Sequence, residues 1–198
     1  IFALYGDIEA AIEGGGFIPS LFVVSGRVFN HDGDDQTEFV ENAVERAVRD
    51  LHVEFGCKVF NLSYGDLNKV YDHGHVRGLA YTLDRLTREL GVLFVVSTGN
   101  LTLEALPHDP IAAFPGYLLE DHARLLDPAT ALNAVTVGGI ARHEATRGQQ
   151  VRPHLIDDRP IARAGHPFPL TRSGPSINGA IKPDFVEHAG NLAVVQLT

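Results

Sequence analysis

The sequence is poor in residues that would build a disulfide scaffold, a thiolate metal cluster or a membrane segment. Cys57 is the only cysteine among 198 residues, so no disulfide forms within the chain and no cysteine cluster binds a structural zinc ion. No apolar run approaches the roughly 20 residues that cross a bilayer, and we predict no membrane-spanning segment. Lys and Arg total 16 against 25 Asp and Glu, a formal net charge of −9. Because an acidic surface repels phosphate backbones, we expect no nucleic-acid partner.

Methionine and tryptophan are absent as well. Since a translated chain starts with methionine and this one starts with Ile1, we expect an internal segment of a longer protein, with any targeting signal outside it. The sequence therefore gives no expectation for localisation or oligomeric state. Its 44% hydrophobic and 21% charged residues are typical of a folded globular chain, and 198 residues are enough for one compact domain.

Apolar runs and amphipathic segments alternate along the chain. Continuous apolar runs predict strands, and apolar residues at three-to-four-residue spacing predict helices. The predicted strands are 21–29, 59–62, 92–96 and 134–137; the predicted helices are 35–55 and 76–90. Gly56 and Gly91 are expected to end the two helices. Asp35 and Glu38 are expected to form a capping box at the start of the first helix. A short helix is predicted over 118–126, and 143–178 is predicted to be loops and extended segments. The alternation indicates an α/β fold with a mostly parallel sheet covered on both faces.

Ligands of parallel α/β sheets bind outside the carboxyl ends of the strands. Two segments lie at such ends. Ser63, Tyr64 and Gly65 follow the second predicted strand, and their small residues and glycine allow another extended chain to approach the backbone. Ser97, Thr98, Gly99 and Asn100 follow the third, and Asn100 brings a neutral carboxamide with two N–H donors.

Four stretches, in this order and at these separations, resemble the subtilisin-like serine proteases, the subtilase or peptidase S8 family. They are VFNLSYGD at 59–66, GVLFVVSTGN at 91–100, LNAVTVGGI at 132–140 and IKPDF at 181–185. The resemblance implies a subtilisin-like three-layer αβα fold with a mostly parallel sheet. It also implies acyl transfer from a polypeptide substrate through a serine ester, without a cofactor. Residues 1–198 would then be a partial catalytic domain of this family, truncated at both ends.

The same resemblance assigns roles to residues of this chain. Asn100 matches the asparagine that donates a hydrogen bond to the oxyanion of the tetrahedral intermediate. The backbone of Ser63, Tyr64 and Gly65 matches the segment that pairs with the bound peptide as an extra strand. Ser97, Thr98 and Gly99 match the wall of the pocket for the side chain before the scissile bond.

The catalytic triad of the family is not found in the sequence. The resemblance implies a His-Gly-Thr motif before Ile1, an aspartate farther upstream and a Gly-Thr-Ser nucleophile beyond Thr198. We therefore expect the parent protein to be a serine endopeptidase of Ser-His-Asp type, and the 198 residues alone to be inactive. The chain departs from the family pattern at 187–190, where Glu-His-Ala-Gly follows Lys-Pro-Asp-Phe-Val, and at Leu101 and Thr102. Substrate preference is not predicted.

Other interpretations remain open at this point. Asn100 after a glycine is also typical of a turn residue. A non-catalytic relative that kept the fold and the peptide groove would carry the same motifs. A nucleotide-binding α/β domain is disfavoured, because Gly14, Gly15 and Gly16 precede their strand and lack a phosphate-loop pattern. The acidic and histidine-rich stretches at 31–35 and 72–75 lack the ligand spacing of a recognised metal site, and we predict no metal.

Overall fold

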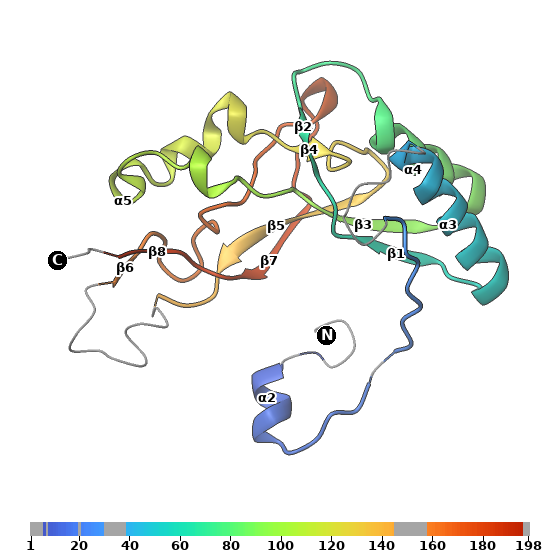
Figure 1. Ribbon diagram of the computed structural model, residues 1–198, viewed down its shortest axis with the longest axis horizontal. Coiled ribbons are helices and arrows are strands. Elements are labelled where there is room, and N and C mark those ends of the chain that lie inside the picture. Colours follow the sequence, from blue (N-terminus) through green and yellow to red (C-terminus); the bar gives the residue numbers. More distant parts are fainter. Residues whose placement is uncertain (1–5, 7, 20, 30–38, 145–157, 196–198) are drawn as a thin grey trace. The chain divides into compact units, whose positions relative to one another are not determined.

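The computed structural model of the chain describes residues 6, 8–19, 21–29, 39–144 and 158–195 (Figure 1). These residues form two compact units, one within residues 1–57 and one within 58–198. No helix in the described ranges is long and apolar enough to cross a bilayer. The same ranges contain no group of three or more His, Cys, Asp or Glu side chains placed to hold a metal ion.

The first unit contains the helices α2 (Ile8–Glu13) and α3 (Val40–Phe55). The amphipathic pattern that predicted α3 is realised, with Ala43, Val44 and Val48 buried. Gly56 ends the helix as predicted, with a φ of 67° and its N–H bonded to His52 O. The predicted capping box lies outside the described residues, and the cap residue of the described helix, Phe39, makes no side-chain hydrogen bond.

The predicted buried strand over 21–29 is wrong. Residues 21–29 form no strand, and Phe22 is fully exposed. A strand needs a neighbour to accept and donate its backbone hydrogen bonds, and no other described strand pairs with this segment. Instead, part of the segment lies along α3: a Cβ on Gly26 would lie 3.0 Å from Cδ1 of Leu51.

The second unit is built on a four-stranded parallel sheet with the order β1-β3-β5-β7. The strands are β1 (Val59–Leu62), β3 (Leu93–Ser97), β5 (Val135–Ala141) and β7 (Phe185–Ala189). Asn61 pairs with Val95, Val95 with Val135, and Val137 with Phe185. The structure confirms the α/β class, the parallel sheet and the predicted strands β1, β3 and β5. Strand β7 was not predicted as a strand.

The core of this unit lies between the sheet and the helix α4 (Gly78–Leu90), which packs against β3 (Figure 1). Leu79, Leu83 and Leu86 of the helix are fully buried, as are Phe94 and Val96 of the strand. The leucines recur every three to four residues along the helix, and Phe94 and Val96 lie two residues apart in the strand. Each group therefore lies on one face of its element, and the two apolar faces pack together. Gly91 ends α4 with a φ of 62°, which confirms the predicted stop.

The connection from β3 to β5 carries short elements and one strand that matters for the site. The helix predicted over 118–126 is wrong: two 3₁₀ turns, η2 (Gly116–Leu119) and η3 (Asp121–Ala123), are separated by extended Glu120. After them β4 (Leu126–Asp127) pairs antiparallel with β2 (Asp66–Val70), and this pairing draws the chain out of helical geometry. The remaining elements are η1 (Leu103–Ala105), α5 (Pro110–Ala113), β6 (Asp158–Pro160), η4 (Ile177–Gly179) and β8 (Ala193–Val195). Strand β6, which lies in the region predicted to be loops and extended segments, pairs antiparallel with β8.

Candidate active site

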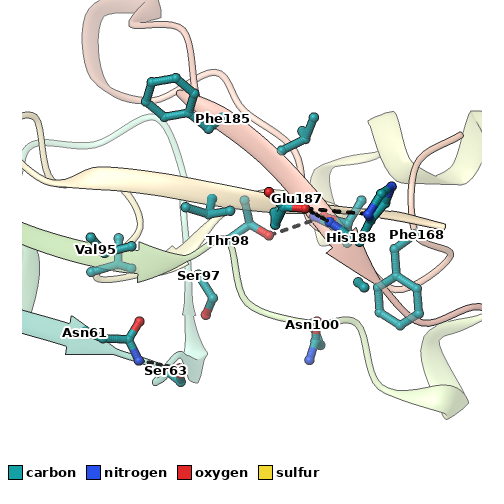
Figure 2. A pocket seen from close by; sticks show the side chains of 17 residues that line it. Asn61, Ser63, Val95, Ser97, Thr98, Asn100, Phe168, Phe185, Glu187 and His188 are labelled. Atoms are coloured by element: carbon teal, nitrogen blue, oxygen red, sulfur yellow. Dashed lines mark hydrogen bonds and ion pairs between the residues drawn. The ribbon is translucent and has the colours of Figure 1, made fainter. Parts of the chain in front are cut away.

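A groove of about 680 Å³ lies along the sheet, and its lining includes predicted site residues from the ends of β1 and β3 (Figure 2). Ser63, Ser97, Thr98 and Asn100 all line it, so four of the seven predicted residues meet at one place. Tyr64, Gly65 and Gly99 are not among the lining residues. The other lining residues are Asn61, Val95, Val96, Val137, Gly138, Gly139, Phe168, Thr171, Phe185, Val186, Glu187, His188 and Ala189.

The backbone of Asn100 is held by contacts with Thr171 and Arg172. Its carbonyl oxygen accepts a hydrogen bond from Arg172 Nε at 3.0 Å, and its backbone bridges to Thr171. The buried guanidinium of Arg172 also donates to His122 O at 2.8 Å and Arg124 O at 2.9 Å, so three backbone carbonyls converge on one side chain. Burial lowers the pKa of Arg172, yet a guanidinium stays protonated in proteins.

The carboxamide of Asn100 is exposed and hydrogen-bonds to no residue that the structure describes. Figure 2 shows it among the side chains that line the groove. Gly99, immediately before it, has a φ of 86°, a backbone geometry that favours glycine. The preceding strand and the Arg172 contacts thus fix the backbone of Asn100, while its two N–H donors remain available.

Ser97 and Thr98 differ in what their side chains contact. Ser97 is exposed at the end of β3, whereas Thr98 is buried, with Oγ1 3.3 Å from Thr171 Oγ1. Thr171 Oγ1 in turn accepts the N–H of Gly139 at 3.1 Å. These bonds connect the exit of β3 to β5 through Thr171, so Thr98 contributes to the wall of the groove from a rigid position.

The segment 63–65 joins β1 to β2 and belongs to neither strand. Asn61 Nδ2, in β1, donates to Ser63 Oγ at 3.2 Å, and both residues line the groove (Figure 2). At the end of the segment Gly65 lies against Gly99, since a Cβ on Gly65 would be 3.5 Å from the Gly99 Cα. The backbones of the two predicted peptide-binding segments therefore approach each other closely at their glycines.

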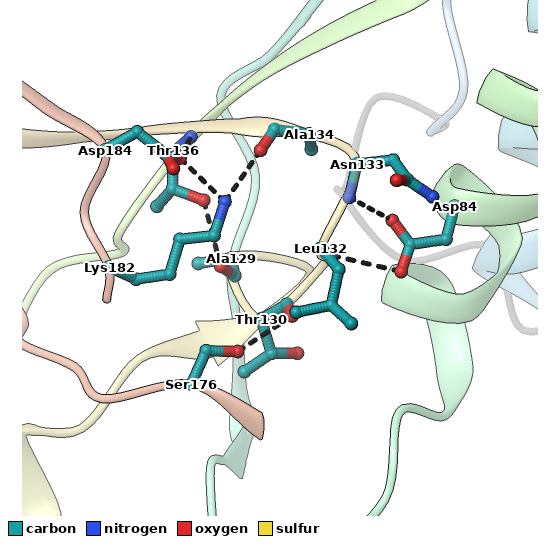
Figure 3. Close-up of polar contacts among 10 residues, drawn as sticks. All are labelled: Asp84, Ala129, Thr130, Leu132, Asn133, Ala134, Thr136, Ser176, Lys182 and Asp184. Carbon is teal, nitrogen blue, oxygen red and sulfur yellow. Dashed lines mark hydrogen bonds and ion pairs between the residues drawn. The ribbon is translucent and has the colours of Figure 1, made fainter. Parts of the chain in front are cut away.

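An ion pair between a buried lysine and a partly exposed aspartate connects the start of β7 to the start of β5 (Figure 3). Lys182 Nζ donates to Ala134 O at 2.7 Å and to Asp184 Oδ2 at 2.6 Å. Asp184 Oδ2 also accepts the N–H of Thr136 at 2.7 Å. Partial burial alone would raise the pKa of Asp184, but the hydrogen bonds from Lys182 and Thr136 and the lysine charge outweigh it and lower the pKa. The sequence showed Lys182 and Asp184 only as part of a motif, without this role.

The helix α4 is held at its start by a carboxylate from a distant part of the chain. Asp127 Oδ1 accepts the N–H of Ala80 at 2.8 Å, and Oδ2 accepts that of Leu79 at 3.0 Å. Both are N-terminal donors without an intrahelical partner, and the cap residue Arg77 supplies no side-chain bond. Asp84 on the same helix accepts the backbone N–H groups of Leu132 and Asn133 (Figure 3). Sequence reasoning missed both, because the partners lie 47 to 49 residues apart.

Among the residues that the structure describes, no serine is paired with a general base. The described serines are 25, 63, 97, 173 and 176. Ser173 Oγ donates to Leu118 O and Ser176 Oγ to Thr130 O, both backbone acceptors, and Ser63 Oγ accepts from an amide. None hydrogen-bonds a histidine, which is the contact that activates a serine nucleophile.

Comparison with known proteins adds evidence of ancestry. The sequence model of the subtilase family, Peptidase_S8, matches residues 3–198. The uncharacterized protein y4bN of Sinorhizobium fredii is 40% identical over 151 residues, which are 75% of this chain and 35% of that protein. The chain thus spans about a third of this curated relative.

Two solved structures were also found to be similar. The patellamide maturation protease PatA shares 20% identity at a TM-score of 0.40, over 72% of this chain and 36% of PatA. The prenylagaramide maturation protease PagA shares 19% identity at a TM-score of 0.40, over 85% of this chain and 46% of PagA.

Proposed function

The chain belongs to the subtilase family, and we propose that it forms the oxyanion-donating and peptide-binding part of a serine endopeptidase of Ser-His-Asp type. Peptidases of this family act on polypeptides, so the proposed substrate is a polypeptide. The observation that carries the proposal is the placement of Asn100, an available carboxamide on a fixed backbone at the rim of a groove.

This placement suits the chemistry of acyl transfer. Negative charge develops on the carbonyl oxygen of the scissile bond, and a neutral donor that is already in position stabilises it without reorganisation. Arg172 and the Thr171 bridge hold the Asn100 backbone, and the carboxamide has no competing partner among the described residues. Such a donor strengthens its bond as the charge forms, so it contributes to the transition state more than to substrate binding.

The groove supplies the second part of the proposal. A bound peptide would lie extended along residues 63–65, which follow the strand β1, while residues 97–99, which follow β3, would wall the pocket for the side chain before the scissile bond. Pairing of a peptide with an existing strand edge gives affinity through main-chain hydrogen bonds, and pockets between the edges give specificity. Ser63 and Ser97, which line the groove and are exposed, would contact such a peptide.

The nucleophile, the base and the aspartate that orients the base are proposed to lie outside residues 1–198. The lack of a serine–histidine pair among the described residues supports this assignment. It follows that the 198 residues alone should not hydrolyse peptides, whereas the full-length protein should.

The test is the replacement Asn100→Ala in the full-length protein. We expect kcat on a peptide substrate to fall by roughly 10²–10³, about 2.7–4 kcal/mol, with KM nearly unchanged; this magnitude is taken from subtilisin, not worked out from this chain. The matched control is Asn133→Ala, since Asn133 is exposed and lies away from the groove, and it should leave kcat unchanged.

A kcat for Asn100→Ala within a factor of about three of the wild type, under 1 kcal/mol on the barrier scale, would make Asn100 a turn residue. A full-length protein that binds peptides but hydrolyses none would instead support the alternative hypothesis, that the protein is a non-catalytic, peptide-binding relative of the subtilases. Circular dichroism of each variant confirms that it is folded.

A further inference from the structure

The two proposed peptide-binding segments meet at a pair of glycines, and one side chain fills the space beside both. A Cβ on Gly65 would lie 2.9 Å from Cδ1 of Leu126, and a Cβ on Gly99 would lie 2.6 Å from the same atom. Both distances are shorter than a carbon–carbon contact allows. Leu126 is therefore pressed against the backbone of both segments, and its side chain is almost completely buried.

Leu126 is held in this position by its own backbone. Its N–H donates to the carbonyl oxygen of Thr98 at 3.3 Å, one residue before Gly99. Its strand β4 also pairs with β2, which begins one residue after Gly65. On its other side, Asp127 accepts the two N-terminal N–H groups of α4. The Leu126 N–H thus ties the leucine to the segment 97–99, and its neighbour Asp127 pairs with Asp66 at the start of β2 and holds the start of α4.

The groove agrees with this arrangement. Ser63, Ser97, Thr98 and Asn100 line it, but neither the two glycines nor Leu126 does. The places where Leu126 packs on Gly65 and Gly99 are therefore not part of the open groove.

From these contacts we propose that Leu126 determines substrate specificity: the site accepts only a small residue, Gly, Ala or Ser, immediately before the scissile bond. This inference rests on the proposed function, in which residues 97–99 wall the pocket for that side chain. A larger side chain entering between Gly65 and Gly99 meets the atoms of Leu126, and packed interiors do not absorb such an overlap without strain.

The experiment uses the full-length protein and a series of peptides that differ only in the residue before the scissile bond: Gly, Ala, Ser, Leu or Phe. We expect kcat/KM for the Ala peptide to exceed that for the Phe peptide by about tenfold or more. The variant Leu126→Ala should raise the Phe-to-Ala ratio of kcat/KM by about tenfold. The matched control is Leu125→Ala, which truncates the neighbouring buried leucine and should leave the ratio unchanged.

Two further arms keep the outcome decisive. If Leu126→Ala does not fold, the smaller truncation Leu126→Val should still move the preference toward Leu over Ala. A wild-type protein that cleaves after Phe as well as after Ala overturns the inference and leaves the proposed function intact.

Failure of the proposed function has a different signature, since no peptide of the series would then be hydrolysed. In that case the dissociation constants of product peptides ending in Ala or Phe test the inference. Tighter binding of the Ala peptide, reversed in Leu126→Ala, supports it; equal binding overturns it.

Discussion

Replacement of Lys182 by Met tests how the sheet is held behind the groove. The ammonium group is buried, with 3% of the side chain exposed, and it bonds Ala134 O at 2.7 Å and Asp184 Oδ2 at 2.6 Å. Met keeps most of the length and apolar contact of the lysine stem but donates no hydrogen bond. The change therefore isolates the loss of two charge-assisted bonds that join the beginnings of β5 and β7.

The expected cost is about 2–3 kcal/mol of unfolding free energy. Removing one partner of a buried ion pair costs about 3–5 kcal/mol, because the other charge stays buried without compensation. Here the side chain of Asp184 is 35% exposed and still accepts the N–H of Thr136, so water solvates part of its charge and the cost falls below that range. The carbonyl of Ala134 loses its lysine donor, which adds to the cost.

The assay is urea unfolding of the full-length protein, monitored by far-UV circular dichroism. These 198 residues contain no tryptophan whose fluorescence could report on their unfolding. The matched control is Lys58→Met, which makes the same chemical change at an exposed lysine and should alter stability by less than about 0.5 kcal/mol. The double variant Lys182→Met/Asp184→Asn should be less destabilised than the sum of the single variants, because it leaves no unpaired charge. If Lys182→Met costs no more than Lys58→Met, the ion pair does not hold the sheet.

Two further predictions concern carboxylates. The pKa of Asp184 is lowered in the folded chain, so its contribution to stability is complete above its ordinary pKa of 3.8 and is lost as the pH falls through the folded pKa. The unfolding free energy of Asp184→Asn should therefore fall less steeply with decreasing pH than that of the wild type. Identical acid profiles of the two proteins would contradict this assignment. Asp127→Asn should lower the unfolding free energy by about 1.5–3 kcal/mol, because one neutral amide oxygen replaces a charged carboxylate that accepts two helix N–H groups. The control is Asp50→Asn, which makes the same change at an exposed aspartate. Equal urea midpoints for the two variants would refute the capping role.

The parts of the fold that follow from local patterns were predictable. β1, β3 and β5 are apolar or small-residue segments, α4 has a period of 3.6, and Gly56 and Gly91 end their helices as expected. The strand β7 was missed because four of its five residues are exposed, so it lacks the apolar run that marks a buried strand. The run at 21–29 predicted a strand wrongly, because an apolar run does not specify whether a pairing partner exists.

The candidate site was predictable only as far as its motifs reach. Ser63, Ser97, Thr98 and Asn100 were expected near one another because carboxyl ends of parallel strands share an edge, and the structure brings them to one groove. Leu126 could not be found in the same way, since its contacts with Gly65 and Gly99 depend on a strand pairing that no local pattern shows. The carboxylate of Asp127 and the ion pair of Lys182 are long-range partners for the same reason.

The proposed function requires that the serine nucleophile lie in the full-length protein outside residues 1–198. Labelling of that protein with a fluorophosphonate probe, followed by peptide mapping of the modified residue, tests it most directly. We predict that one serine is labelled stoichiometrically and that this serine lies outside residues 1–198. A full-length protein with no labelled serine, or with the label on a serine within these 198 residues, would contradict it.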